Sequence, residues 1–136
     1  VDVALAVGAD AVQRASTSLP VKDVRGLVGG RLKIGASVHS LPEAIEAEIN
    51  SADWVVFGPV YETPSKRGFG PPQGLDKLSR VATAVKIPVI AIGGITPERV
   101  REVRRAGAQG VAVISAILTA DSPAAATRRF LEALAA

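Results

Sequence analysis

The sequence contains no cysteine and no methionine among its 136 residues, and aromatic residues make up only 4% of it. Without cysteine, a disulfide framework, a thiolate nucleophile and a thiolate metal site are excluded. A nucleic-acid surface needs stacking aromatics or a dense basic stripe, and the net charge is only +3. No apolar run approaches the ~20 residues that cross a bilayer. The function class that these absences do not exclude is chemistry on small molecules that requires no thiol group.

The amino-terminal segment has no features of a targeting sequence. It begins at Val1 and lacks the basic start and the cleavage site of a signal peptide. The arginines at 99–105 and 128–129 fall in segments with helical spacing, where solvated helix faces are expected. We therefore expect a cytoplasmic protein with no nucleic-acid or membrane partner. Because an initiator methionine is missing, we also expect a chain truncated upstream.

Short β-branched runs alternate with segments of helical spacing along the whole chain. Strands that alternate with helices pair in parallel, so the fold class is α/β. The right-handed crossover rule leaves a doubly wound sheet or part of a (β/α)8 barrel. A complete barrel needs ~200–250 residues, so residues 1–136 would form one partial-barrel domain of about five βα units. The predicted strands are 11–15, 32–38, 54–60, 88–92 and 110–114.

The predicted helices begin at recognisable caps. Ser40 and Glu43 have capping-box spacing, and the pairs Thr96–Pro97 and Ser122–Pro123 begin two later helices. Apolar spacing predicts the buried faces of these helices. Those faces include Leu41, Ala44, Ile45 and Ile49 in the helix after Ser40, and Thr127, Phe130, Leu131 and Leu134 in the last helix.

Gly93 and Gly94 follow a predicted strand at the end where parallel α/β folds place their chemistry. With Thr96–Pro97 next, they put backbone N–H groups at a helix start, which suits a phosphate group. Ser115, after the neighbouring strand, is placed to donate to the same anion. A tight turn with only a structural role is the alternative. The combination favours an anion site.

The loop 61–74 is rich in Gly and Pro and is long for a compact domain. Thr63, Ser65 and Lys66 bring two hydroxyls and an ammonium together, a set that suits phosphate oxygens. A solvated surface loop is the alternative. Trp54 and Tyr61 are interpreted as packing residues.

Ser37 and His39 lie at the end of another predicted strand. If Val38 packs outward against helices, Ser37 faces the barrel mouth, because alternate strand residues point to opposite faces. His39 is the only histidine, and it is either a structural residue or a candidate catalytic group.

Five segments together resemble the thiamine phosphate synthase/TenI family, in the expected order and spacing over essentially the whole chain. This resemblance implies a (β/α)8 barrel, of which the chain would supply the part from the third helix to the eighth. The segments are Gly-Ala-Ser-Val-His-Ser-Leu-Pro-Glu-Ala (35–44), Gly-Pro-Val-Tyr-Glu-Thr-Pro-Ser-Lys (58–66), Gly-Pro-Pro-Gln-Gly-Leu (70–75), Ile-Pro-Val-Ile-Ala-Ile-Gly-Gly-Ile-Thr-Pro-Glu (87–98) and Ala-Gly-Ala-Gln-Gly-Val-Ala-Val-Ile-Ser-Ala-Ile (106–117).

The resemblance implies a thiamine biosynthesis enzyme, a transferase that couples hydroxymethylpyrimidine diphosphate with thiazole phosphate and releases pyrophosphate. Mg²⁺ is expected to assist the departure of pyrophosphate. By resemblance, Ser37 and Lys66 contact the pyrophosphate. The residues implied for thiazole phosphate are Thr63, Pro64, Ser65, Gly93, Gly94, Ile114 and Ser115.

The sequence departs from the family pattern at strand four, where a His-Leu-Gly-Gln-x-Asp motif normally supplies an Mg²⁺-binding Asp. Ser18 stands at that position and is a poor ligand for Mg²⁺, so the ligands of the metal are not expected in this chain. Serine here and Ser-Val-His-Ser (37–40) are familiar from the TenI branch, which includes a thiazole tautomerase. The histidine of that tautomerase, however, corresponds to Pro59.

Three hypotheses therefore remain open. The first is a synthase-type enzyme whose fragment is inactive alone, the second a TenI-type thiazole tautomerase, and the third a non-catalytic thiazole-phosphate-binding or regulatory protein. All three bind small phosphorylated molecules, and self-association into a homo-oligomer is compatible with each.

Overall fold

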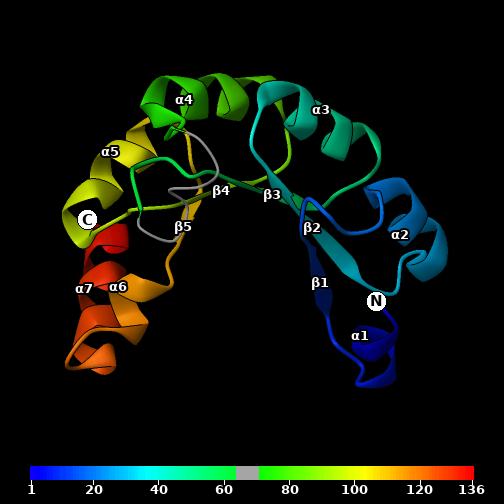
Figure 1. Ribbon diagram of the computed structural model, residues 1–136, viewed down its shortest axis with the longest axis horizontal. Coiled ribbons are helices and arrows are strands. Elements are labelled where there is room, and N and C mark those ends of the chain that lie inside the picture. The colour runs from blue at the N-terminus through cyan, green and yellow to red at the C-terminus, as the bar shows by residue number, and fades with distance from the viewer. Residues whose placement is uncertain (64–70) are drawn as a thin grey trace.

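The computed structural model describes residues 1–63 and 71–136, which form a five-stranded parallel sheet curved into an arch (Figure 1). Each strand pairs with the next one along the chain, so the order in the sheet is β1-β2-β3-β4-β5. The strands are β1 (Ala11–Arg14), β2 (Lys33–Val38), β3 (Trp54–Phe57), β4 (Val89–Ile92) and β5 (Gly110–Ala112).

Helices connect consecutive strands and lie along the outer side of the arch (Figure 1). A short helix, α1, precedes the first strand, and a 3-10 helix, η2, leads directly into α5. The helices are α1 (Asp2–Ala6), α2 (Val21–Val28), α3 (Leu41–Ile49), α4 (Gly74–Ala84), η2 (Pro97–Arg99), α5 (Val100–Arg105), α6 (Ser115–Leu118) and α7 (Pro123–Ala135).

The strand order decides between the two α/β architectures. A doubly wound sheet reverses its order at a switch point, whereas here the order never reverses. With right-handed crossovers, an unreversed order places every connecting helix on the same face of the sheet. The chain is therefore an arc of a (β/α) barrel with five βα units, as predicted. Within the described residues, β1 and β5 each pair on one side only.

The core lies between the strands and the outer helices. Ile34, Val55 and Phe57 point toward the helices and are fully buried. Their strand neighbours point to the concave inner face, where Ser37 and Val56 are only half-buried. The condition for placing Ser37 is met, because Val38 packs on the helix side at 2% exposure. The inner face thus remains accessible, and its polar side chains are available to a ligand.

Two of the three predicted caps are confirmed. Ser40 Oγ accepts from the Glu43 backbone N–H at 3.3 Å, and Ser122 Oγ accepts from the Ala125 N–H at 3.3 Å. Thr96 is instead the N-cap residue of η2 and makes no side-chain cap hydrogen bond. The prediction of a single capped helix from this position was wrong, because the first turn adopts tighter 3-10 geometry before α5 begins.

The predicted buried face of α3 was partly wrong. Ala44 and Ala47 face the sheet, whereas Ile49 is 75% exposed. Small side chains at the contact let α3 lie close to the strands, which the larger isoleucines would prevent. Leu131 on α7 was also predicted to be buried and is 60% exposed, while Phe130 beside it is buried.

The end of the chain differs from the prediction in one element. After β5 the backbone turns at once into α6, a four-residue helix that begins at Ser115. Four residues are too few for hydrophobic periodicity to reveal a helix.

None of the helices formed by the described residues has the length and apolarity needed to cross a membrane.

Candidate functional site

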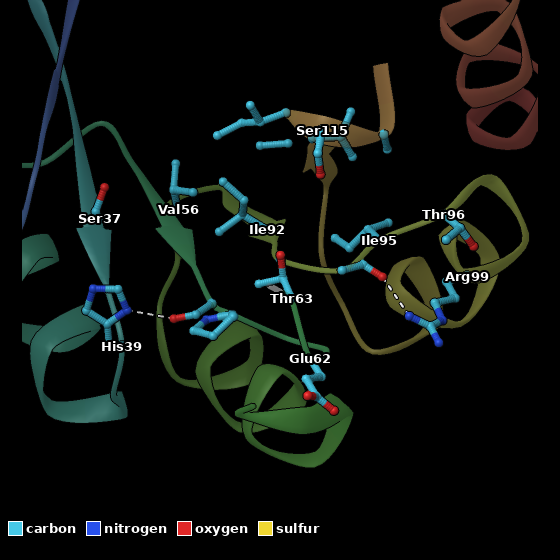
Figure 2. Close-up of a pocket in the computed structure, with 18 of the residues that line it drawn as sticks. Ser37, His39, Val56, Glu62, Thr63, Ile92, Ile95, Thr96, Arg99 and Ser115 are labelled. Atoms are coloured by element: carbon cyan, nitrogen blue, oxygen red, sulfur yellow. Dashed lines mark hydrogen bonds between the residues drawn. The ribbon is translucent and has the colours of Figure 1, made fainter. Parts of the chain in front are cut away.

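A cavity of about 530 Å³ opens at the carboxyl ends of the strands, on the concave side of the arch. Figure 2 shows side chains from several strand ends converging on it. Its location matches the end of the sheet at which (β/α) barrels and other parallel α/β folds bind their substrates. Its lining includes Ser37, His39, Thr63, Gly93, Gly94 and Ser115.

The structure brings most of the sequence-predicted residues together in this cavity. Ile114 lines it as well as the residues just given. Pro64, Ser65 and Lys66 lie outside the described residues. Ser18 does not line the cavity; it lies in an exposed turn after β1, where its carbonyl oxygen accepts from Arg14 Nη2 at 3.4 Å.

The Gly93–Gly94 turn can be built only from glycine. Both residues have positive φ, +101° and +63°. A Cβ on Gly93 would lie 2.6 Å from Pro59, and one on Gly94 would lie 2.5 Å from the carbonyl oxygen of Glu62. The turn is also hydrogen-bonded to the segment that contains Pro59 and Glu62, because the Tyr61 N–H donates to the Gly93 carbonyl oxygen at 3.0 Å. The glycines therefore serve both the backbone conformation and a close packing that fixes the cavity wall.

The turn presents hydrogen-bond donors at the cavity. Among residues 1–63 and 71–136, no acceptor receives the backbone N–H of Gly94 or Ile95. Figure 2 shows the hydroxyl groups of Thr63 and Ser115 turned toward the space between them. Neutral donors that converge on one space suit the oxygens of a phosphate group. The nearby side chains of Val56 and Ile92 are apolar and suit an aromatic or aliphatic body.

Arg99 lines the cavity and hydrogen-bonds to the turn. Its Nη1 donates to the Gly94 carbonyl oxygen at 2.7 Å, and its guanidinium carbon lies 4.3 Å from the centre of the Tyr61 ring. The Tyr61 hydroxyl in turn donates to the Glu102 carboxylate. The cation–π contact of Arg99 and the hydrogen bond to Glu102 join η2 and α5 to the segment before Thr63. Tyr61 thus has a polar role as well as the packing role predicted for it.

The hydrogen bond between the Tyr61 hydroxyl and Glu102 can be tested by titrating Tyr61. Burial, the hydrogen bond to Glu102 and the charge of that carboxylate raise the pKa of Tyr61 well above its ordinary 10.0, although Arg99 opposes them. Tyr61 is the sole tyrosine, so alkaline difference absorbance reads it alone. We expect a midpoint above ~10 in the folded chain and near ~10 in urea. Glu102→Gln should lower the folded midpoint, because it removes the negative charge.

The same shift has a definite sign for stability. Because the folded pKa exceeds the unfolded one, the stabilisation from the protonated phenol is complete below about pH 10. It is lost as the pH rises through the folded pKa. Tyr61→Phe is the control and should abolish the absorbance transition. A midpoint near 10 in the folded chain would contradict the contact with Glu102.

His39 is held in one orientation at the cavity. Its Nδ1 lies 2.6 Å from the carbonyl oxygen of Gly58. A carbonyl oxygen only accepts, so Nδ1 carries the hydrogen, and Nε2 of the neutral ring is an acceptor. The geometry allows His39 to receive a proton from a ligand, which keeps it as a candidate catalytic group.

Sequence reasoning missed Glu62 and Arg99, which also line the cavity, as does Thr96 from the predicted helix start. Glu62 precedes Thr63 directly, so its position beside a predicted site residue was the available signal. Arg99 gave no local signal, because it was interpreted as part of a solvated helix face. Its contact with Gly94 depends on η2 turning the chain back toward the glycines.

Sequence comparisons place these features in a family context. A family model described as thiamine monophosphate synthase matches residues 1–117. The thiamine-phosphate synthase of Chloroflexus aurantiacus is 44% identical over 129 residues, which cover 95% of this chain and 59% of that protein. The thiamine-phosphate synthase of Salinispora arenicola is 46% identical over 132 residues, which cover 97% of this chain and 64% of that protein. The chain thus spans less than two thirds of these relatives.

A solved structure shows the same arrangement. The thiamine phosphate pyrophosphorylase from Pyrococcus furiosus superimposes with a TM-score of 0.88 at 41% sequence identity. The match covers 98% of this chain and 63% of that chain. This chain therefore has the fold of that protein over the matched region.

Proposed function

Because this chain belongs to the thiamine monophosphate synthase family, we propose that it forms the thiazole-phosphate half of a thiamine phosphate synthase. In this proposal residues 1–136 act as one partial-barrel domain. The observation that carries it is the cavity at the strand ends, where the Gly93–Gly94 turn and the Ser115 hydroxyl face a common space. The reaction joins hydroxymethylpyrimidine diphosphate and thiazole phosphate into thiamine phosphate.

The proposed chemistry is a substitution at the methylene carbon of the pyrimidine. The bond between that carbon and the diphosphate oxygen breaks, and its electron pair leaves with pyrophosphate. The lone pair of the thiazole nitrogen then forms the new carbon–nitrogen bond, so no oxidant or reductant is needed. Donors that meet the departing oxygens lower the barrier because negative charge develops there.

The residues divide between the two phosphate groups. Gly93, Gly94, Ile114 and Ser115 would hold the thiazole phosphate through backbone N–H groups and one hydroxyl. Thr63 would close the same site from the other side. Ser37, on the opposite wall of the cavity, would donate to the pyrophosphate, as would Lys66, which lies outside the described residues.

The described residues do not fit Mg²⁺, the metal that the family reaction implies. Mg²⁺ requires oxygen ligands, preferably carboxylates. At the position of the family's Asp, Ser18 lies beside the Arg14 guanidinium, which occupies the carbonyl oxygens of Ser16 and Ser18 at 3.3 and 3.4 Å. Within residues 1–63 and 71–136, no three His, Cys, Asp or Glu side chains form a metal-binding group. We therefore derive no step through a metal.

A second candidate, a TenI-type thiazole tautomerase, is favoured by His39. Tautomerisation moves one proton between two positions of the thiazole and changes no oxidation state. An Nε2 acceptor fixed by the bond from Nδ1 to Gly58 suits that transfer. Tautomerase activity needs neither the pyrimidine substrate nor a metal at the Ser18 position.

Substrate coupling separates these functions. Formation of thiamine phosphate from the two substrates would support the synthase. Conversion between thiazole tautomers without the pyrimidine would favour the second candidate. Residues 1–136 alone are expected to bind without turnover if they are part of a synthase, so the activities are assayed on the chain extended upstream to the length of its relatives. Calorimetric binding of thiazole phosphate with neither activity in that longer protein would favour the binding-only protein. Absence of thiazole phosphate binding would contradict all three.

Ser115→Ala tests the phosphate site itself. The serine hydroxyl would donate to a charged oxygen, and such hydrogen bonds are worth about 1.5–3 kcal/mol. We expect thiazole phosphate to bind roughly 10-fold to 100-fold more weakly, measured by calorimetry. Ser79→Ala is the matched control, because Ser79 lies exposed on α4 and does not line the cavity. Equal affinities for the two variants would contradict the proposed role of Ser115.

A further inference from the structure

Three side chains form a chain of hydrogen bonds across the first three strands of the inner face. Trp54 Nε1 donates to Gln13 Oε1 at 3.1 Å, and Gln13 Nε2 donates to Ser37 Oγ at 3.1 Å. The strand register brings them together, because Gln13 on β1 pairs with Gly35 on β2, and Gly35 pairs with Trp54 on β3. We call this set, Trp54–Gln13–Ser37, the inner-face relay.

Gly35 makes the relay sterically possible. A Cβ at this position would lie 2.1 Å from Gln13 Oε1 and 2.2 Å from the Trp54 ring. The ring and the amide therefore occupy the space above the glycine and meet across the middle strand. Gly35 has no positive φ, so the close approach, not backbone conformation, accounts for glycine here.

The chemistry of the three groups fixes the direction of the relay. An indole N–H only donates, so the Gln13 atom that it meets is the carbonyl oxygen. The amide nitrogen is then turned toward Ser37, and because it only donates, the Ser37 oxygen accepts. A hydroxyl has a single hydrogen, which remains available for another acceptor. Ser37 lines the cavity, so that acceptor can be a ligand oxygen.

We propose that Gln13 and Trp54 are positioning residues that make Ser37 a hydrogen-bond donor to an anionic ligand oxygen in the cavity. The identity of that ligand as a pyrophosphate-type group rests on the proposed function. The relay orients Ser37 before the ligand binds, so the entropic cost of fixing the hydroxyl is paid during folding. Trp54 influences the ligand without contacting it.

The relay can be observed without any ligand. Trp54 is the only tryptophan, so the ¹⁵N-labelled chain gives a single indole N–H signal. Gln13→Ala should shift this signal and speed its exchange with solvent, because the indole loses its acceptor. Gln109→Ala removes another exposed amide that forms no part of the relay, and should leave the signal unchanged. If Gln13→Ala changes neither the chemical shift nor the exchange rate of the indole N–H, the relay does not exist, whatever the protein binds.

Inorganic pyrophosphate tests the donor role by calorimetry. Gln13→Ala and Trp54→Phe should each weaken its binding about threefold to tenfold, as expected for loss of one hydrogen bond. In a Ser37→Ala background the same two changes should have almost no further effect, because both act through Ser37. A residue that only supported the fold would weaken binding equally in both backgrounds. Circular dichroism would verify that each variant remains folded.

The outcomes separate the relay from the proposed function. Additive losses in Gln13→Ala and Ser37→Ala would overturn the positioning role even if pyrophosphate binds. Unchanged affinity in Ser37→Ala would overturn its donor role. If the unsubstituted chain binds neither pyrophosphate nor thiazole phosphate, both the proposed function and the donor role fail. The indole signal would still decide whether the relay itself exists.

Discussion

Gly94→Ala is expected to weaken binding of the proposed ligand, thiazole phosphate, by about tenfold to hundredfold, because a shift of the turn displaces its N–H donors. An alanine Cβ would lie 2.5 Å from the Glu62 carbonyl oxygen and 2.8 Å from Tyr61 Cβ. Neither neighbour is the end of a flexible side chain, so the backbone must move. Strain at positive φ and the steric clash together should lower the free energy of unfolding by about 2–4 kcal/mol.

Gly8→Ala is the matched control for this variant. Gly8 has φ +65°, close to the +63° of Gly94, but nothing lies within 4 Å of a Cβ built on it. It should therefore lose only the conformational part of the stability, about 1–2 kcal/mol, and should bind thiazole phosphate normally. Urea denaturation and calorimetry measure the two effects separately. Equal losses in the two variants would refute the idea that close packing fixes the turn.

Phe57→Ala is expected to lower the free energy of unfolding by about 3–5 kcal/mol, the usual cost of truncating a large buried aromatic side chain. Phe57 is fully buried on the helix side of β3, and its strand partners are Val38 and Ala91. Removing the ring leaves a cavity between the sheet and the helices, which the packed neighbours cannot fill. Urea denaturation monitored by circular dichroism gives the change.

Val56→Ala is the comparison within the same strand. Val56 points to the half-open inner face and lines the cavity, so its truncation should cost only about 1 kcal/mol. The effect should appear mainly in ligand affinity, because an apolar contact with the ligand is lost. A larger loss of stability for Val56→Ala than for Phe57→Ala would contradict a core between the sheet and the outer helices.

Local sequence patterns were sufficient for the order and type of most elements. Apolar runs such as 88–92 predicted parallel strands, and the Ser40 and Ser122 caps predicted two helix starts that the structure confirms. Helix faces were less predictable. Spacing alone could not show that α3 contacts the sheet through Ala44 and Ala47, since the contacting residues depend on how closely the helix approaches the sheet.

The residues of the candidate site also differ in whether the sequence alone could predict them. Gly93, Gly94 and Ser115 could be selected from the sequence, because glycines and hydroxyls at strand ends have a direct physical meaning. Arg99 could not, since its contact with Gly94 depends on the path of η2. Roles within the cavity therefore followed from sequence only where a residue acts through its own backbone or its immediate neighbours.

The sequence by itself determined the family, the alternation of strands and helices, and the glycine turn at the end of β4. The alternation and the turn each depend on residues close together in the chain. Only the tertiary structure decided the contact of Arg99 with Gly94 and the inner-face relay. The relay joins residues separated by 24 and 41 positions. Such contacts exist only once parallel pairing sets the register, and no local preference of Gln13 or Trp54 specifies that register.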